Sequence, residues 1–280
     1  MNIYAFLEYA SRLFTEISEC PKLEAELILA HVLAKPCSFL IAHPEYQLST
    51  KQQQEAGILI QKRRTGTPLA YLTGMQEFYG LPFLVTPDVL IPRPETELLV
   101  ERAISFLQKG GGTLLDIGTG SGCIAISVAH NAKPHKIIGV DISPKALLIA
   151  RKNARLHKRS IQFLQGDLLP TGILFSKLPR PLIIAANLPY VPEGEAHSST
   201  RQEPQSALYS GKDGLLHYKR LFPLLKNIEF DVLLFEFHPP QQKALEEIAT
   251  RFFPTSQGKM YPDLSGLPRI GEIIKTNFSL

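Results

Sequence analysis

The chain has 280 residues, 44% of them hydrophobic and 20% charged, and a net charge of +4. This mix is typical of a soluble globular enzyme and excludes a disordered or fibrous chain, and so mild a positive charge does not by itself indicate a nucleic-acid partner. No apolar run approaches the roughly 20 residues that span a bilayer, and the start lacks the pattern of a secretory signal. We therefore expect a cytoplasmic protein without membrane contact. The cysteines and histidines show no metal-ligand spacing, so no metal is predicted.

Residues 1–72 carry apolar side chains at helical spacing and predict a small all-α domain. We expect three helices, of which the second begins near Pro21 and the third after Ser49, where Gln52 can complete a capping box. The third helix ends in basic residues 62–64, which either complement the helix macrodipole or contact an acidic partner. Seven basic and seven acidic side chains cancel across this domain. It is therefore a poor nucleic-acid-binding arm, and we interpret it as a substrate-recognition domain.

Residues 73–92 mix aromatic and β-branched residues with glycine and proline, and predict a β-hairpin linker. Residues 93–280 then alternate between helical and apolar strand patterns. This alternation predicts an α/β domain with a mostly parallel sheet covered on both faces. The expected strands lie at 113–118, 136–141, 161–167, 181–187 and 230–237, and the expected helices at 98–107, 123–132 and 144–157.

A glycine-rich turn follows the first of these strands, just after Asp116. Such a turn lets the backbone approach a ligand closely. The dinucleotide fingerprint would need its third glycine at Cys123, and the observed G-x-G-x-G spacing resembles instead the S-adenosylmethionine loop of class I methyltransferases. On this loop alone, a nicotinamide cofactor remains the alternative. The predicted cofactor-binding residues of the turn are Gly118, Thr119, Gly120, Ser121 and Gly122.

The next two strands also end in carboxylates, Asp141 and Asp167. Ligands of open α/β sheets bind at the carboxyl ends of strands. Asp141 could accept hydrogen bonds from both ribose hydroxyls, while Asp167 is placed to face an adenine with Leu168 beside the ring. A single aspartate at a strand end often only caps the next helix, but three successive strand ends of this kind favour a nucleotide-like ligand.

The fourth strand ends in Asn187, Leu188, Pro189 and Tyr190. As structure alone, the proline ends the strand and the tyrosine packs on it. As chemistry, the Asn187 side-chain carbonyl and the Leu188 backbone carbonyl could hold both protons of an NH₂ group and turn its nitrogen towards a methyl donor, while Tyr190 offers a flat face to a planar target. "NLPY" resembles the (Asn/Asp)-Pro-Pro-Tyr motif of enzymes that methylate planar nitrogens. These four residues are the predicted catalytic set, and Asn187 is also expected to contact the cofactor.

The segment "PLAYLTGMQEFYGLPFLVTPDVLIPRPETELLVE", followed by "DIGTGSGCIAIS", "NLPYVP", "QEPQSAL", "GKDGL" and "DLSGLPR", resembles the HemK/PrmC family of peptide chain release factor N5-glutamine methyltransferases. The resemblance runs from about residue 60 to the C-terminus. It implies a class I (Rossmann-like) methyltransferase domain behind a helical domain, with S-adenosyl-L-methionine as cofactor. It also implies methylation of the glutamine in the Gly-Gly-Gln motif of class I peptide chain release factors, and we expect a monomer.

The chain departs from the family pattern at two positions. Leu188 replaces the first proline of the tetrad, which keeps the backbone carbonyl but loses the fixed φ of proline. His238 stands where the family often has glycine, so we expect the local loop to differ. Arg93 and Glu95 in "IPRPETE" either shape the entrance of the pocket or simply start the following helix.

Two other functions stay open. A nucleic-acid amino-methyltransferase, of the adenine N6 type, would share the tetrad, but the neutral helical domain and the lack of a basic target-recognition region disfavour it. A catalytically weakened adaptor of the same fold would explain Leu188, but the intact Asn187, Pro189 and Tyr190 argue against it.

Overall fold

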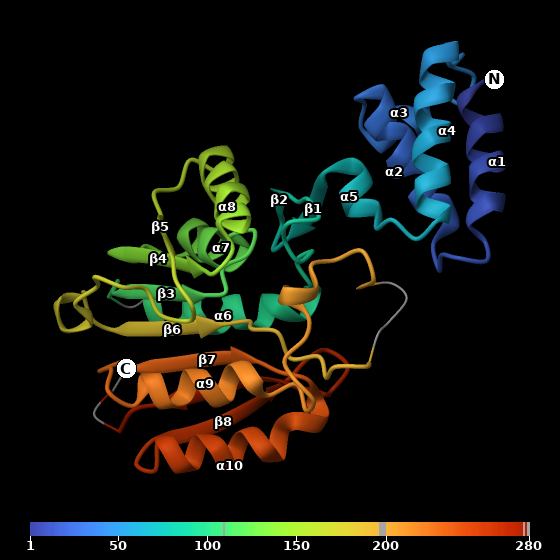
Figure 1. Ribbon diagram of the computed structural model, residues 1–280. Helices are drawn as coiled ribbons and strands as arrows, with labels where there is room; N and C mark the ends of the chain where they lie inside the picture. The colour runs from blue at the N-terminus through green and yellow to red at the C-terminus, as the bar shows by residue number, and fades with distance from the viewer. Residues whose placement is uncertain (109, 196–199, 277, 279–280) are drawn as a thin grey trace. The chain divides into compact units, whose positions relative to one another are not determined.

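Figure 1 shows the computed structural model of the chain, which describes residues 1–108, 110–195, 200–276 and 278. The chain divides into two units. The first contains residues 1–75 with 200–202, and the second contains the other described residues. Within the described part of the chain, no helix is both long and apolar enough to cross a membrane.

The first unit is helical, as expected from its apolar spacing. Pro21 occupies the first turn of its helix, and Ser49 and Gln52 form the predicted capping box. Two short helices were not predicted, because five or six residues are too few to show a helical repeat. The helices are α1 (Ile3–Phe14), α2 (Pro21–Leu33), α3 (Cys37–Ala42), α4 (Thr50–Arg64) and α5 (Leu69–Thr73).

The three basic residues at the end of α4 differ in how far they are buried. Arg63 turns back onto α2, where its Nε lies 2.6 Å from Glu24 Oε2 and its Nη2 lies 3.0 Å from Oε1. Both side chains are mostly buried. Lys62 and Arg64 are exposed. At least one residue of the triplet therefore has a structural role.

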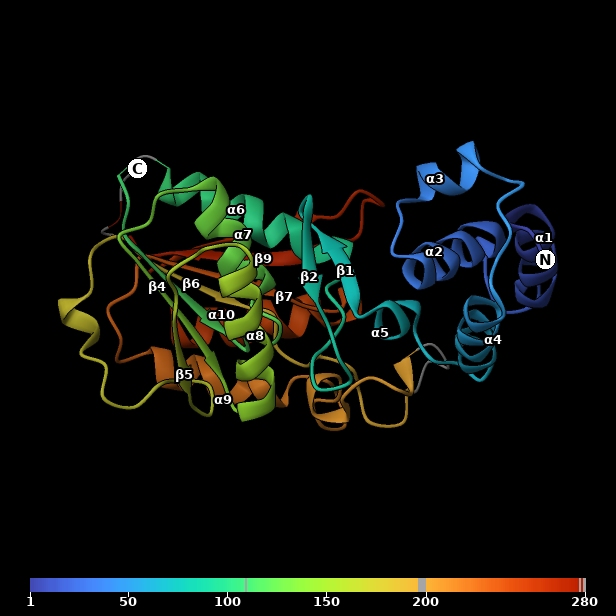
Figure 2. The same ribbon diagram turned by 90° about the horizontal axis from the view of Figure 1, so that it is seen from above.

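Residues after α5 form a two-stranded sheet of β1 (Met75–Phe78) and β2 (Leu81–Leu84). Tyr79 and Gly80 both have positive φ, the backbone of a tight two-residue hairpin turn. Asn153 of α8 (Pro144–Leu156) accepts from the backbone N–H of Leu84 and donates to its carbonyl, which fixes β2 beside that helix (Figure 2).

The second unit is built on a seven-stranded sheet with the order β5-β4-β3-β6-β7-β9-β8. The first five strands of this order are parallel, which confirms the predicted mostly parallel sheet, while β9 pairs antiparallel with both of its neighbours, β7 and β8. The last two strands were not predicted. The strands are β3 (Thr113–Ile117), β4 (Lys136–Asp141), β5 (Gln162–Gln165), β6 (Leu182–Ala186), β7 (Val232–Glu236), β8 (Gln257–Pro262) and β9 (Pro268–Ile274).

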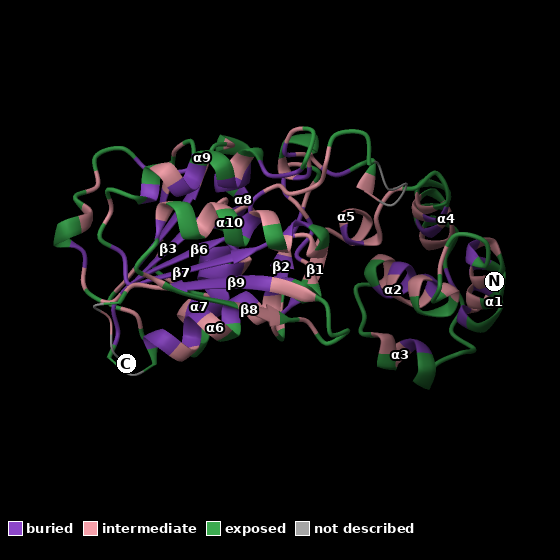
Figure 3. Cartoon of the chain, turned by 90° about the horizontal axis from the view of Figure 1, so that it is seen from below, coloured by how far each residue is buried: buried purple, intermediate pink, exposed green. Residues whose placement is uncertain are grey.

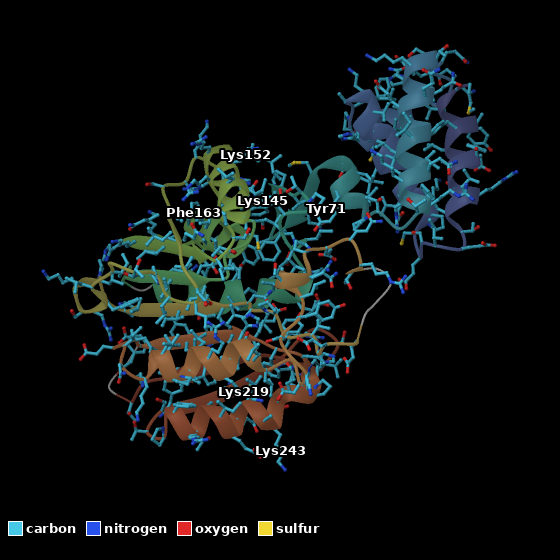
Figure 4. All side chains as sticks on the ribbon, in the orientation of Figure 1. Tyr71, Lys145, Lys152, Phe163, Lys219 and Lys243 are labelled. Atoms are coloured by element: carbon cyan, nitrogen blue, oxygen red, sulfur yellow. The ribbon has the colours of Figure 1, made fainter. Side chains whose placement is uncertain are left out.

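Helices cover both faces of this sheet (Figure 1). α6 (Glu97–Leu107), α7 (Cys123–Asn131) and α8 pack on one face, and Phe163 of β5 belongs to that core (Figure 4). α9 (Leu216–Leu225) and α10 (Gln242–Phe252) pack on the other. Every residue of β3, β6 and β7 is buried (Figure 3). This double burial explains why these strands read as continuous apolar runs.

The strand order places the site. From β3 the chain moves outward through β4 to β5, and then returns to the other side of β3 as β6. The position between β3 and β6 is therefore the topological switch point, where such sheets bind ligands. The register pairs Ile117 with Ala186, so Gly118 and Asn187 leave neighbouring strands at the same edge.

Candidate active site

A cavity of about 320 Å³ opens at this carboxyl edge of the sheet. Its volume falls within the range of small-molecule sites. The structure brings most of the predicted site residues together here, although Gly122 and Tyr190 are not part of the lining. The predicted residues that line the cavity are Gly118, Thr119, Gly120, Ser121, Asp141, Asp167, Leu168, Asn187, Leu188 and Pro189.

The glycine loop presents bare backbone to the cavity. The N–H groups of Gly118 and Thr119 donate to the Val140 carbonyl at 2.8 and 2.9 Å, which anchors the loop to β4. Gly120 has φ +54, and a Cβ added there would meet nothing closer than 3.9 Å, so its outer side is open to a ligand. A Cβ on Gly122 would instead press against α8 at Ala150. Gly122 therefore allows close packing of the helices, and its contact with the cofactor stays a prediction.

Asp141 is the last residue of β4, and backbone N–H groups hold its carboxylate in place. Its Oδ2 accepts from the Gly120 N–H and its Oδ1 from the Ser143 N–H, both at 2.8 Å. Burial raises the pKa of this carboxyl group, while the two backbone N–H groups favour its charged form. Each carboxylate oxygen keeps a further lone pair, so the group can still accept from two hydroxyls.

Asp167 and Leu168 line the cavity beyond β5. Asp167 Oδ2 accepts from Arg220 Nη2 of α9 at 2.6 Å, and both side chains are about half exposed. Leu168 has φ +68, an uncommon and strained conformation for a leucine. Its side chain is nevertheless buried. Strain of this kind concentrates at ligand sites, because the surrounding structure must hold it in place.

Asp116 lies fully buried at the start of the glycine loop, where Thr119 Oγ1 donates to its Oδ2 at 2.6 Å. Burial raises the pKa of this carboxyl group to about 7, and the Thr119 hydrogen bond opposes that shift. The sequence placed Asp116 before the loop but assigned it no role.

Asn187 is held through its amide nitrogen. Nδ2 donates to Thr96 Oγ1 at 2.9 Å and to Glu236 Oε2 at 3.0 Å. Thr96 Oγ1 itself donates to the same Glu236 oxygen at 2.6 Å. The Tyr190 hydroxyl donates to the other carboxylate oxygen, Oε1, at 3.0 Å. Two predicted catalytic residues thus converge on one carboxylate.

Sequence reasoning missed both Thr96 and Glu236. Glu236 ends β7 between two phenylalanines and is fully buried. A charged residue in so apolar a strand needs partners, because burying an isolated charge is costly. That signal was present in "LLFEF", but no feature of the sequence named the partners.

The segment before α6 combines the two roles considered for it. Pro94 and Glu95 belong to a short 3-10 helix, η1 (Pro94–Thr96), that leads into α6. Arg93 lines the cavity and forms an ion pair with the buried Glu203. His238, in turn, caps another 3-10 helix, η5 (Pro239–Gln241).

The described residues contain no group of three or more His, Cys, Asp or Glu side chains that could hold a metal ion. The cavity chemistry is that of backbone N–H groups, carboxylates and amides.

Two family models match the chain: the PrmC N-terminal domain over residues 5–74 and the methyltransferase domain over residues 114–202. The release factor glutamine methyltransferase of Escherichia coli strain K12 is 39% identical over 206 residues, 71% of this chain and 72% of that protein. The enzyme of the same name from Koribacter versatilis is 38% identical over 260 residues, 89% of this chain and 90% of that protein. The chain belongs to the release factor glutamine methyltransferase family.

A solved structure supports the fold of this family member. The catalytic domain of hMettl16, in complex with the MAT2A 3'UTR hairpin 6, aligns with a TM-score of 0.56 at 13% identity. The alignment covers 88% of this chain and 92% of that one. At so low an identity, the likeness shows the fold alone.

Proposed function

We propose that this methyltransferase transfers a methyl group from S-adenosyl-L-methionine to the side-chain amide nitrogen, N5, of the glutamine in the Gly-Gly-Gln motif of class I peptide chain release factors. The observation that carries the proposal is the position of Asn187. It lines one cavity with the glycine loop and Asp141, at the switch point of the sheet. Membership of the family supplies the class of substrate.

The residues present fit this cofactor. The open side of Gly120 would admit it next to the loop, and Asp141 would accept from the ribose hydroxyls. Asp167 and the buried Leu168 would flank the adenine. When bound, S-adenosylmethionine supplies an electrophilic methyl group on a sulfonium.

The role of Asn187 and Leu188 follows from the chemistry of a carboxamide. Its nitrogen is a poor nucleophile because the lone pair is delocalised. If the Asn187 side-chain carbonyl and the Leu188 backbone carbonyl accept its two N–H groups, they fix its orientation and favour the positive charge that develops on it. No hydrogen bond to either carbonyl oxygen is found within the described ranges of the chain. Alignment of reacting groups can lower a barrier by about 7–11 kcal/mol, and the proton can leave after transfer.

We also propose that residues 1–72 recognise the release factor and that residues 73–92 link them to the methyltransferase domain of residues 93–280. The match of residues 5–74 to the PrmC N-terminal domain supports this division. The balanced charge of residues 1–72 favours a protein surface as partner over nucleic acid.

The test is methyl transfer from labelled S-adenosylmethionine to a class I release factor, beside a copy whose Gly-Gly-Gln glutamine is changed to alanine. Label on the normal factor alone is expected. Label on neither factor, with the cofactor bound, would overturn the proposal and make DNA and RNA the next substrates. Asn187→Ala is expected to bind cofactor almost normally but to lose transfer, and full activity in that variant would remove Asn187 from the mechanism.

A further inference from the structure

The amide of Asn187 has a defined polarity. Its nitrogen, Nδ2, donates to Thr96 Oγ1 and Glu236 Oε2, at 2.9 and 3.0 Å. The carbonyl oxygen is therefore what Asn187 can offer to the cavity that it lines. A substrate NH₂ group needs an acceptor there, and an amide turned by half a rotation would present a donor instead.

We propose that Glu236 is a positioning residue that sets this polarity, an inference that rests on the proposed function. Burial raises the pKa of Glu236, but its two oxygens face three donors, from Thr96, Asn187 and Tyr190, and this arrangement fits the ionised carboxylate. An ionised carboxylate only accepts hydrogen bonds. It can face the NH₂ end of Asn187 but not the carbonyl end, where oxygen would meet oxygen. Because Glu236 is fully buried, water cannot take over this selection.

Thr96 completes the arrangement. Its hydroxyl has one proton, which it donates to Glu236 Oε2 at 2.6 Å. The Thr96 oxygen is consequently left as an acceptor for the NH₂ group of Asn187. The direction of every hydrogen bond in this triad follows from the carboxylate.

Glu236 itself is fixed from two sides. The Tyr190 hydroxyl donates to its Oε1 at 3.0 Å. The buried Tyr218 hydroxyl of α9 lies within hydrogen-bonding distance of the backbone carbonyls of Glu236 and Ala186, which share its one proton. The ends of β6 and β7 are thus joined just where Asn187 and Glu236 lie.

The experiment exchanges the amide and the carboxylate. Asn187→Asp puts two carboxylates against each other, and Glu236→Gln lets the neighbouring amide adopt either polarity. In N187D/E236Q, one oxygen of the new carboxylate accepts from the new amide and the other faces the cavity. We expect kcat to fall at least about 100-fold in N187D and roughly tenfold in E236Q, with recovery in the double variant, since directly contacting residues commonly couple by roughly 2- to 150-fold.

Thr96 offers a matched pair. Thr96→Val keeps the shape but removes the hydroxyl, and is expected to lower kcat by roughly tenfold with the KM for cofactor unchanged. Thr96→Ser keeps the hydroxyl, and its kcat should be close to that of the wild type. Melting temperature and cofactor affinity of every variant show whether folding is intact. The positioning role would be overturned if the losses of kcat in N187D and E236Q were additive in N187D/E236Q. It would also be overturned if T96V and T96S were equally active.

A second measurement does not depend on turnover. In a proton–nitrogen correlation spectrum, the Asn187 side-chain amide is identified by its loss in N187D. Its protons should exchange slowly with solvent in the wild type and faster in T96V and E236Q, and equal exchange in all three would contradict the inference. If the wild type fails to methylate a release factor while these signals behave as expected, the proposed function fails, and only the polarity that Glu236 gives to the Asn187 amide stands.

Discussion

Leu188 packs its side chain against Gly118. The contact is so close that a Cβ on that glycine would lie 3.0 Å from Leu188 Cδ2 and 3.3 Å from the backbone carbonyl oxygen of Asn187. The two residues leave neighbouring parallel strands at the switch point of the sheet. The residue that replaces the family's proline thus has a buried contact with the glycine loop. The departure from the motif is accommodated inside the site.

Gly118→Ala should weaken cofactor binding. The substitution adds this close contact at a backbone φ of +74, which L side chains rarely adopt. We expect affinity for S-adenosylmethionine, measured by calorimetry, to fall by roughly 10- to 100-fold, a loss of about 1.4–2.8 kcal/mol. Gly57→Ala in α4 is the matched control, because a Cβ there meets nothing within 4 Å. It should leave affinity unchanged and stabilise the helix by up to about 1 kcal/mol.

Asp116 should make stability depend on pH. Its pKa is raised by burial from about 3.8 to about 7, so between these values the folded state holds a proton that the unfolded chain releases. The free energy of unfolding therefore falls as pH rises through this window, by an amount on the order of 4 kcal/mol for this group. Asp116→Asn cannot titrate. Its stability relative to the wild type, from denaturant melts, should increase from pH 4 to pH 7 and level off above, and a constant difference would contradict the assignment.

Asn153 should stabilise both the hairpin and the glycine loop. Its buried amide accepts from the Leu84 N–H at 2.7 Å, and donates to the Leu84 carbonyl at 3.0 Å and the Ser121 carbonyl at 2.9 Å. Asn153→Ala leaves these backbone groups without partners, so we expect a loss of about 2–4 kcal/mol in the free energy of unfolding. Asn153→Asp should be at least as harmful, because a carboxylate cannot donate to two carbonyls. A variant as stable as the wild type would show that water replaces the amide.

Arg63 should differ from its basic neighbours. Its two hydrogen bonds to Glu24, with both side chains mostly buried, make Arg63→Ala costly by about 1–3 kcal/mol. Lys62→Ala should change the free energy of unfolding by less than about 0.5 kcal/mol, because Lys62 is exposed. A cycle with Glu24→Ala measures the pair itself. If Arg63→Ala and Lys62→Ala changed the free energy of unfolding equally, a structural role for Arg63 would be refuted.

The sequence by itself determined the parallel strands of the sheet and the order of the motifs. Strands such as Leu182–Ala186 are buried on both faces, and that burial requires an uninterrupted apolar run, which any reader of the chain can see. The glycine turn and the polar strand ends at Asp141 and Asn187 were equally visible, because parallel strands bring their carboxyl ends to one edge.

The sequence could not reveal which side chains meet at that edge. Thr96 and Glu236 are separated by 140 positions, and their contact depends on the register of β6 against β7 and on the place where η1 enters α6. The ion pair of Asp167 with Arg220 likewise depends on how α9 packs on the sheet. Local periodicity reports which residues face the core, but strand order, register and helix packing decide which polar groups become neighbours. In this protein the glycine loop was determined locally, and the polarity of Asn187 only by the tertiary structure.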